Sequence, residues 1–448
     1  MKGAIAAGHP LTAEAGARVL AEGGNAVDAC VAAACAAFVS EGPLTGPAGG
    51  GFVLAQSSGN TTFLDCFFAA PSRTLGELEE VVVDFADAST QVFHVGPGSV
   101  AVPGLLAGLE ELHRRFGRSS WRELVEPSIE LAREGVDVGE AQAFLHTILA
   151  AILQRDEGGR RLYGNPERVE TSDLVPTLEL IRDQGADAVR ELVPELAGDL
   201  DAYTVAARPP RAADFAGHRV FTAAAPSRGG AVVTQALELL DGRESSVEAM
   251  AEALRAAYEG EAASGAPRLT GTTQISVVDA NGDAVALSST LGSGSGVFRG
   301  GAQLNNMLGE LDVIGPGPRA PGDRLPSMMA PTIALEDGRP RLALGSAGSV
   351  RLAGAIVQVA TAVVGRGQPL AEAIAEPRLH VDNAGRVHLE GGRPEHDAED
   401  LARSGWEVVR WAGRNLFFGG VAAVELRADG SVSAAGDPRR GGHGVVVA

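Results

Sequence analysis

The sequence predicts a mixed fold of the α+β class, and three stretches indicate it. Residues 271–279 and 284–290 each alternate apolar side chains with small or polar ones, which is the period of a half-buried strand. An Asp-Ala-Asn-Gly turn separates them, so we expect a β-hairpin. Residues 13–40 are rich in alanine and broken once by Gly-Gly-Asn, which predicts two helices. Residues 102–135 predict a further helical block.

Composition limits the class of protein. The chain has 448 residues, 45% of them apolar, which is enough for a large core in one or two domains. Its net charge of −20 argues against nucleic acid or an anionic membrane as a partner, because few basic groups could neutralise phosphate. There is no run of 18 apolar residues and no signal-peptide pattern, so we expect a cytoplasmic protein that acts on a small molecule.

Metal-binding and disulfide patterns are missing from the sequence. The three cysteines, Cys30, Cys35 and Cys66, have neither a paired framework nor a metal spacing. Cys30 and Cys35 fall in the alanine-rich helical run, where small buried residues are expected. His380 and His443 are not spaced as a metal set either. We therefore expect no metal and no cofactor.

Other elements can be placed along the chain. Residues 46–54 are a glycine cluster that enters a strand, and the cluster lacks the Lys-Ser/Thr of a phosphate-binding loop. Residues 61–65 and 217–222 predict strands, and residues 144–214 predict a helical, charged section in which residues 199–203 are a helix-to-strand connection. Residues 258–269, rich in Gly, Ala and Pro, predict a loose linker just before the hairpin.

The hairpin begins with chemistry-bearing residues. Its first strand opens on Thr272 and Thr273, and Gly271 precedes them. A threonine hydroxyl becomes a nucleophile when its own α-amine is freed, because that amine titrates at about pH 8 and takes the hydroxyl proton. This requires a cut between Gly271 and Thr272. The alternative is that the two threonines are ordinary β-branched strand residues.

Several segments together resemble the γ-glutamyltranspeptidase family of N-terminal-nucleophile hydrolases. They are residues 3–6, 21–29, 46–54, 102–109, 225–230, 271–279, 303–310, 324–332, 344–351, 376–380 and 436–439, so the resemblance extends over most of the chain. It implies a four-layer αββα sandwich, a stacking that the strand and helix inventory alone does not give. It also implies self-cleavage into fragments 1–271 and 272–448, which stay together as one domain.

The resemblance assigns roles in catalysis. Thr272 is implied as the nucleophile, with its α-amine as the base, and Thr290 as a threonine that hydrogen-bonds it. Gly348 and Ser349 match the glycine turn whose backbone N–H groups stabilise the oxyanion, with serine where a second glycine is usual. Two alternatives stay open. Thr290 could be one half of a cross-strand threonine pair, and the turn could be a plain helix cap.

The substrate-binding half of the resemblance is incomplete. Phe67 stands where the family has the arginine that grips the substrate carboxylate, and a phenyl ring cannot make that bidentate charged pair. Ser327 matches the first serine of a carboxylate-binding pair, whereas the second is Met328. Phe67 could equally be a core aromatic and Ser327 a turn residue. Another arginine, Arg228 or Arg351, could take over the carboxylate.

The residues that bind the substrate amine in the family have matches in this sequence. Asn306 belongs to the matched polar segment, and Glu310 occupies the position of the amine-binding acid, although it could be a solvated loop residue. Three functions remain. The one we favour is hydrolysis of a C–C bond beside a 2-oxo acid, with oxalate release, as in homologues from bacterial antibiotic pathways. The alternatives are a γ-glutamyl hydrolase or transferase acting on compounds such as glutathione, and a non-catalytic ligand-binding relic.

Overall fold

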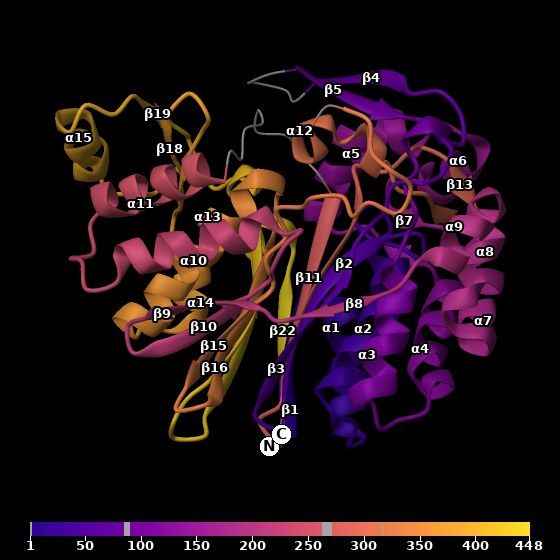
Figure 1. Ribbon diagram of the computed structural model, residues 1–448, viewed down its shortest axis with the longest axis horizontal. Coiled ribbons are helices and arrows are strands. Elements are labelled where there is room, and N and C mark those ends of the chain that lie inside the picture. The colour runs from indigo at the N-terminus through magenta and orange to yellow at the C-terminus, as the bar shows by residue number, and fades with distance from the viewer. Residues whose placement is uncertain (1, 85–89, 262–270, 316) are drawn as a thin grey trace.

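The computed structural model describes residues 2–84, 90–261, 271–315 and 317–448. Two antiparallel sheets pack face to face, and helices cover the outer face of each sheet (Figure 1). This is the four-layer αββα sandwich that the resemblance implied, and the prediction is confirmed. Both chain ends lie close together at one end of the sheets (Figure 1).

The two sheets draw their strands from distant parts of the chain. The larger sheet contains, in spatial order, β22 (His443–Val447), β1 (Gly3–Ala7), β11 (Gly271–Asp279), β12 (Ala284–Gly292), β2 (Gly50–Ser57), β3 (Asn60–Cys66) and β8 (Ala206–Arg208). The smaller sheet contains β21 (Val432–Gly436), β20 (Gly420–Leu426), β16 (Arg339–Ala347), β15 (Thr332–Glu336), β10 (His218–Thr222) and β9 (Arg211–Phe215).

Separate sets of helices cover the two outer faces (Figure 1). On the larger sheet lie α1 (Pro10–Ala21), α2 (Ala26–Ser40), α3 (Leu105–Phe116), α4 (Trp121–Glu134) and α7 (Val175–Gln184). On the smaller sheet lie α10 (Arg228–Leu240), α11 (Val247–Gly260), α13 (Leu352–Ala360) and α14 (Leu370–Ala375), with α15 (Glu395–Arg403) outside α11. The predicted helices in residues 13–40 and 102–135 are thus present.

The predicted hairpin is β11 and β12, but its strands are buried on both faces rather than half-buried. Ile275 and Val277 pack against the outer helices, whereas Val278 belongs to the core shared with the second sheet. Side chains on the inner face meet a sheet instead of water, so polar ones there must find partners. The hydroxyl of Ser276, for example, donates to the carbonyl of Ala422 at 2.9 Å.

Two predicted segments differ in the structure. The section predicted as helical to residue 214 is helical only to Ala202: after the predicted helix-to-strand connection, residues 206–208 and 211–215 are strands β8 and β9, which pair with β3 and β10. The predicted linker 258–269 is helical at its start. There α11 continues to Gly260, and the hydroxyl of Tyr258 donates to the carbonyl of Val350 at 2.8 Å. The rest of that linker, residues 262–270, lies outside the described residues.

Smaller elements complete the chain. The helices are α5 (Glu140–Leu153), α6 (Glu157–Tyr163), α8 (Val189–Leu192), α9 (Ala197–Ala202) and α12 (Leu311–Ile314). The short strands are β4 (Glu79–Asp84), β5 (Thr90–Val95), β6 (Val136–Asp137), β7 (Arg168–Val169), β13 (Phe298–Arg299), β14 (Ala302–Gln303), β17 (Leu379–Val381), β18 (Val387–Leu389) and β19 (Val408–Arg410). Within the described ranges, every helix is too short or too polar to cross a membrane.

Candidate active site

Thr272 is the second residue of the central strand β11 and lines a small cavity of about 30 Å³, room for roughly two water molecules. Residues from β12 of the larger sheet, and from loops and short helices beyond the strand ends, surround it. They are Phe67, Thr290, Gly292, Met307, Glu310, Val313, Ser327, Met328, Met329, Ser349 and Leu352. The fold therefore brings most of the predicted site residues to the predicted nucleophile.

The peptide bond before Thr272 is held by the neighbouring strand. The hydroxyl of Thr290 on β12 donates to the carbonyl oxygen of Gly271 and accepts from the backbone N–H of Gly292 at 2.8 Å. The β11–β12 register shifts between Gly271 and Thr273, so the strand is irregular at this peptide. In the uncut chain, Thr290 thus contacts the carbonyl that an attack by Thr272 would convert into an oxyanion.

The predicted oxyanion turn follows β16. Gly348 has φ 134° and Ser349 has φ 57°, and both angles lie in the region that favours glycine. Ser349 lines the cavity with Thr272, and α13 begins shortly after it. The positive φ explains why this position suits a second glycine: a serine can adopt it only at a cost in backbone strain.

Glu310 lines the cavity, but it also supports the loop that follows β12. Its carboxylate accepts from the backbone N–H of Ser293 at 2.9 Å and from the Ser293 hydroxyl at 2.7 Å. The amide oxygen of Asn306 accepts from the same N–H at 2.7 Å and from that of Gly294 at 3.1 Å. Asn306 is not among the residues that line the cavity. Its amide therefore supports the loop after β12 and does not face the cavity.

Phe67 forms an apolar wall. Its ring packs against those of Phe52 and Phe68, with centroids 5.1 and 4.9 Å away. Its carbonyl accepts from the hydroxyl of Tyr203 and from the guanidinium of Arg324, both at 2.6 Å. The two donors fix the backbone of this segment, so the ring is held at the cavity.

A second apolar wall comes from the segment that resembles the serine pair. Met328 and Met329 both line the cavity. The hydroxyl of Ser327 accepts from the backbone N–H of Met329 at 3.1 Å, and the hydroxyl of Ser227 donates to the Met329 carbonyl at 2.6 Å. One serine of the predicted pair therefore reaches the cavity, and it is engaged in a local turn.

Neither candidate replacement arginine lines the cavity. The guanidinium of Arg351 lies over the ring of Phe417, 4.6 Å from its centroid, and burial, with a smaller effect of Arg440, lowers its pKa to about 9. Arg228 begins α10, and its backbone N–H donates to the carbonyl of Ser327 at 2.8 Å. None of the described residues that line the cavity is basic.

Sequence reasoning missed the apolar residues of the cavity. Met307 and Val313 flank Glu310 in the chain, and Leu352 follows the oxyanion turn. Their position beside the matched motifs was a usable signal. Their side chains, however, are indistinguishable in sequence from core residues.

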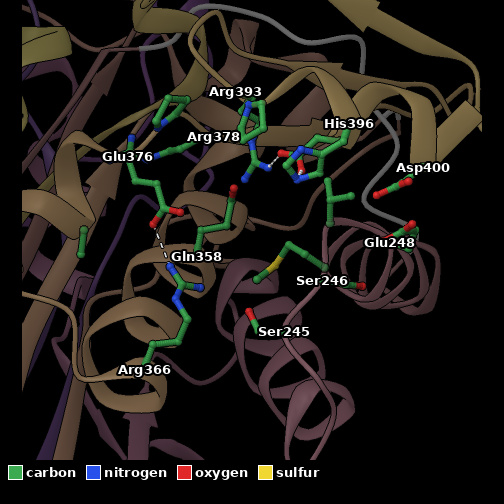
Figure 2. Close-up of a pocket in the computed structure, with 16 residues that line it drawn as sticks. Ser245, Ser246, Glu248, Gln358, Arg366, Glu376, Arg378, Arg393, His396 and Asp400 are labelled. Carbon is green, nitrogen blue, oxygen red and sulfur yellow. Dashed lines mark hydrogen bonds and ion pairs between the residues drawn. The ribbon is translucent and has the colours of Figure 1, made fainter.

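A larger cavity of about 440 Å³ lies among α11, α13, α14 and α15 (Figure 2). It shares no lining residue with the cavity at Thr272. Its arginines are already paired: Arg366 lies 2.7 Å from Glu376, and Arg393 pairs with Asp397 (Figure 2). The cavity at Thr272 and this larger cavity are therefore separate. Among the described residues, no group of His, Cys, Asp and Glu has the arrangement of a metal site.

The sandwich, together with a buried threonine near the start of a central strand, is the arrangement expected of a hydrolase of the N-terminal-nucleophile class. The profile of the family described as "Gamma-glutamyltranspeptidase" matches residues 12–264 and 248–447. The chain belongs to this family.

Relatives match over almost the whole chain. The "Acylase ACY 1 proenzyme" of Pseudomonas sp. (strain SE83) is 29% identical, with 100% of this chain and 94% of that protein covered. The "Glutathione hydrolase proenzyme" of Pseudomonas aeruginosa is also 29% identical, with 99% and 94% covered. The crystal structure of a cephalosporin acylase from Bacillus halodurans has a TM-score of 0.82 at 22% identity, over 99% of this chain and 95% of that one. That likeness shows the same fold.

Proposed function

We propose that the chain cuts itself between Gly271 and Thr272. The hydroxyl oxygen of Thr272 attacks the Gly271 carbonyl carbon, and the C–N bond breaks as an ester forms. Water then hydrolyses the ester, which leaves a carboxylate on Gly271 and a free amine on Thr272. The hydrogen bond from Thr290 to the Gly271 carbonyl supports this step, because a donor at that oxygen stabilises the charge that develops there. The relatives' names include the word "proenzyme".

In the cut enzyme, the hydroxyl of Thr272 is the nucleophile and its α-amine, with a pKa of about 8, is the base. Attack on a substrate carbonyl gives an acyl-enzyme that water or an acceptor amine resolves. The N–H groups of Gly348 and Ser349 stabilise the tetrahedral states. The presence of Ser349 at the cavity with a glycine-like φ supports this role.

We infer that the substrate carries an apolar acyl chain. The observation behind this is the lining of the cavity: Phe67, Met307, Met328 and Leu352 surround Thr272, without a described basic residue. A γ-glutamyl group brings a carboxylate, which would be costly to bury there unpaired. Hydrolysis of an amide with an apolar acyl group fits this lining, and one relative carries the name acylase.

Hydrolysis of a C–C bond beside a 2-oxo acid is the second candidate. The loss of both the arginine, at Phe67, and the second serine, at Met328, favours it over γ-glutamyl transfer. The short loop 311–323 agrees with it. Glu310 at the cavity is the observation that favours a γ-glutamyl substrate, since a carboxylate suits the amine of that group. The third candidate, a non-catalytic ligand-binding relic, would not require the hydrogen bond from Thr290 to the Gly271 carbonyl, so that bond favours an active enzyme over a relic.

Two experiments test the proposal. The intact mass of the purified protein should show fragments that meet at Gly271/Thr272, absent from the Thr272→Ala variant. The cut enzyme is then offered a short-chain acyl anilide, a γ-glutamyl anilide and an unsaturated 2-oxo acid, with oxalate as the readout for the last. We expect the short-chain acyl anilide to be turned over fastest. Faster γ-glutamyl turnover with Phe67 in place would contradict the apolar assignment, and an uncut chain would remove the mechanism.

A further inference from the structure

A buried carboxyl lies directly behind the nucleophile. Glu41 follows the last residue of α2, and its side chain is buried. One carboxyl oxygen accepts from the hydroxyl of Thr273 at 2.6 Å, and the other accepts from the hydroxyl of Thr12 at 2.7 Å. Successive side chains of a strand point to opposite faces, so Thr273 reaches Glu41 while Thr272 lines the cavity on the other face.

The segment that Glu41 begins, residues 41–45, contacts both strands of the hairpin. The carbonyl of Leu44 accepts from the backbone N–H of Leu291 at 3.1 Å. The hydroxyls of Thr45 and Ser289 lie 2.9 Å apart. A side chain on Gly271 would come within 2.9 Å of the backbone of this segment, so the scissile glycine packs directly against it. Only the contact from Glu41 to Thr273 involves an ionisable group.

No charged group among the described residues contributes to the pKa shift of Glu41. Burial raises its pKa to about 7, and the hydroxyls of Thr273 and Thr12 offset part of that rise. Titratable groups on neighbouring elements include His9 at the start of α1, Tyr163, whose hydroxyl lies near Gly42, and His146, which packs on Tyr163. None of these three contributes to the pKa of Glu41.

We propose that Glu41 is a positioning residue for self-cleavage: through Thr273 it holds β11 in the irregular register that sets the Gly271 carbonyl before Thr272. This rests on the proposed self-cleavage. The ionised carboxylate only accepts, so it can hold both threonine hydroxyls at once. The protonated acid must donate from one oxygen, so one of the two contacts has to rearrange. Cleavage should therefore depend on the ionisation of Glu41.

The test compares cleavage rates of the wild type and Glu41→Gln across pH. The chain is made by cell-free synthesis at about pH 5.5, moved to buffers up to about pH 8.5, and sampled by intact mass. Glutamine mimics the protonated acid. We expect equal rates at the acid end and a wild-type rate about tenfold higher at the alkaline end, since a displaced reacting group loses at least that much. A ratio that stays constant with pH would overturn the proposal.

Further variants guard against a folding defect. Thr273→Val removes the hydroxyl but keeps the shape, and it should show the same loss of pH dependence with the carboxyl intact. Thr273→Ser should restore it. Glu22→Gln, at an exposed site after α1, is the matched control and should follow the wild type. If the wild type is not cut at any pH, the proposed self-cleavage fails. If it is cut and Glu41→Gln keeps its pH profile, only the role of Glu41 fails.

Discussion

At the scale of single residues, the hydroxyl of Thr290 donates a hydrogen bond to the Gly271 carbonyl. Thr290→Val removes that donor with little change in shape. We expect self-cleavage to slow by about 10²–10³-fold, which is the typical effect of losing one oxyanion donor. Intact mass followed over time gives the rate. Thr290→Ser keeps a hydroxyl and should cut at nearly the wild-type rate, whereas equal slowing in both variants would point to packing instead.

Ser349 stores backbone strain, because a residue with a side chain is held at φ 57°. Ser349→Gly should raise the free energy of unfolding by roughly 1 kcal/mol and leave the backbone N–H in place. Urea unfolding of the uncut Thr272→Ala background measures this. Ser346→Gly, three residues earlier in the strand β16, is the control and should destabilise. A loss of stability in both variants would show that the Ser349 side chain contributes more than its strain costs.

At the scale of elements, α2 joins the helical layer to the segment at Gly271. Asn25 caps its start, with its side-chain oxygen accepting from Asp28 N–H at 2.9 Å and its amide donating to the Phe116 carbonyl at 2.7 Å. Asn25→Ala should lower the free energy of unfolding by about 1–2 kcal/mol in the Thr272→Ala background. Asn60→Ala, at the exposed first residue of β3, should change it far less. Similar losses would mean that the cap is dispensable.

Elements whose structure is determined by residues close together in the chain could be predicted from the sequence, whereas elements that depend on distant partners could not. The hairpin follows from its period and turn, and α1 and α2 from the alanine-rich run and its Gly-Gly-Asn break. The helix-to-strand connection at residues 199–203 indicated a strand after it, but the partner of β8 could not be foreseen, because β3 lies over a hundred residues away in the chain. The site divides in the same way. Thr272 and Thr290 share one hairpin, whereas the contact of Glu41 with Thr273 spans 232 positions.

At the scale of the whole molecule, a buried carboxyl makes stability depend on pH. Glu41 has an ordinary pKa of 4.5 when unfolded and about 7 when folded. Its contribution is therefore complete below pH 4.5 and is lost as the pH rises through 7, by an amount on the order of 3 kcal/mol. In the Thr272→Ala background, Glu41→Gln should flatten this part of the urea-unfolding profile, since an amide does not titrate. Parallel profiles for the two proteins would contradict the shift.

The proposed cut would leave two fragments, and each of the two sheets contains strands from both. The strand β1 from the first fragment lies between β11 and β22 of the second, and β10 of the first pairs with β15 of the second. Separation would expose unpaired strand edges and both apolar cores to water. We therefore expect the fragments to elute together in gel filtration in native buffer and to separate only in urea, at the concentration where the fold is lost. The uncut Thr272→Ala chain should elute at the same volume. Fragments that separate in native buffer would contradict this prediction, because they would show that at least one fragment keeps a stable fold without the strands of the other.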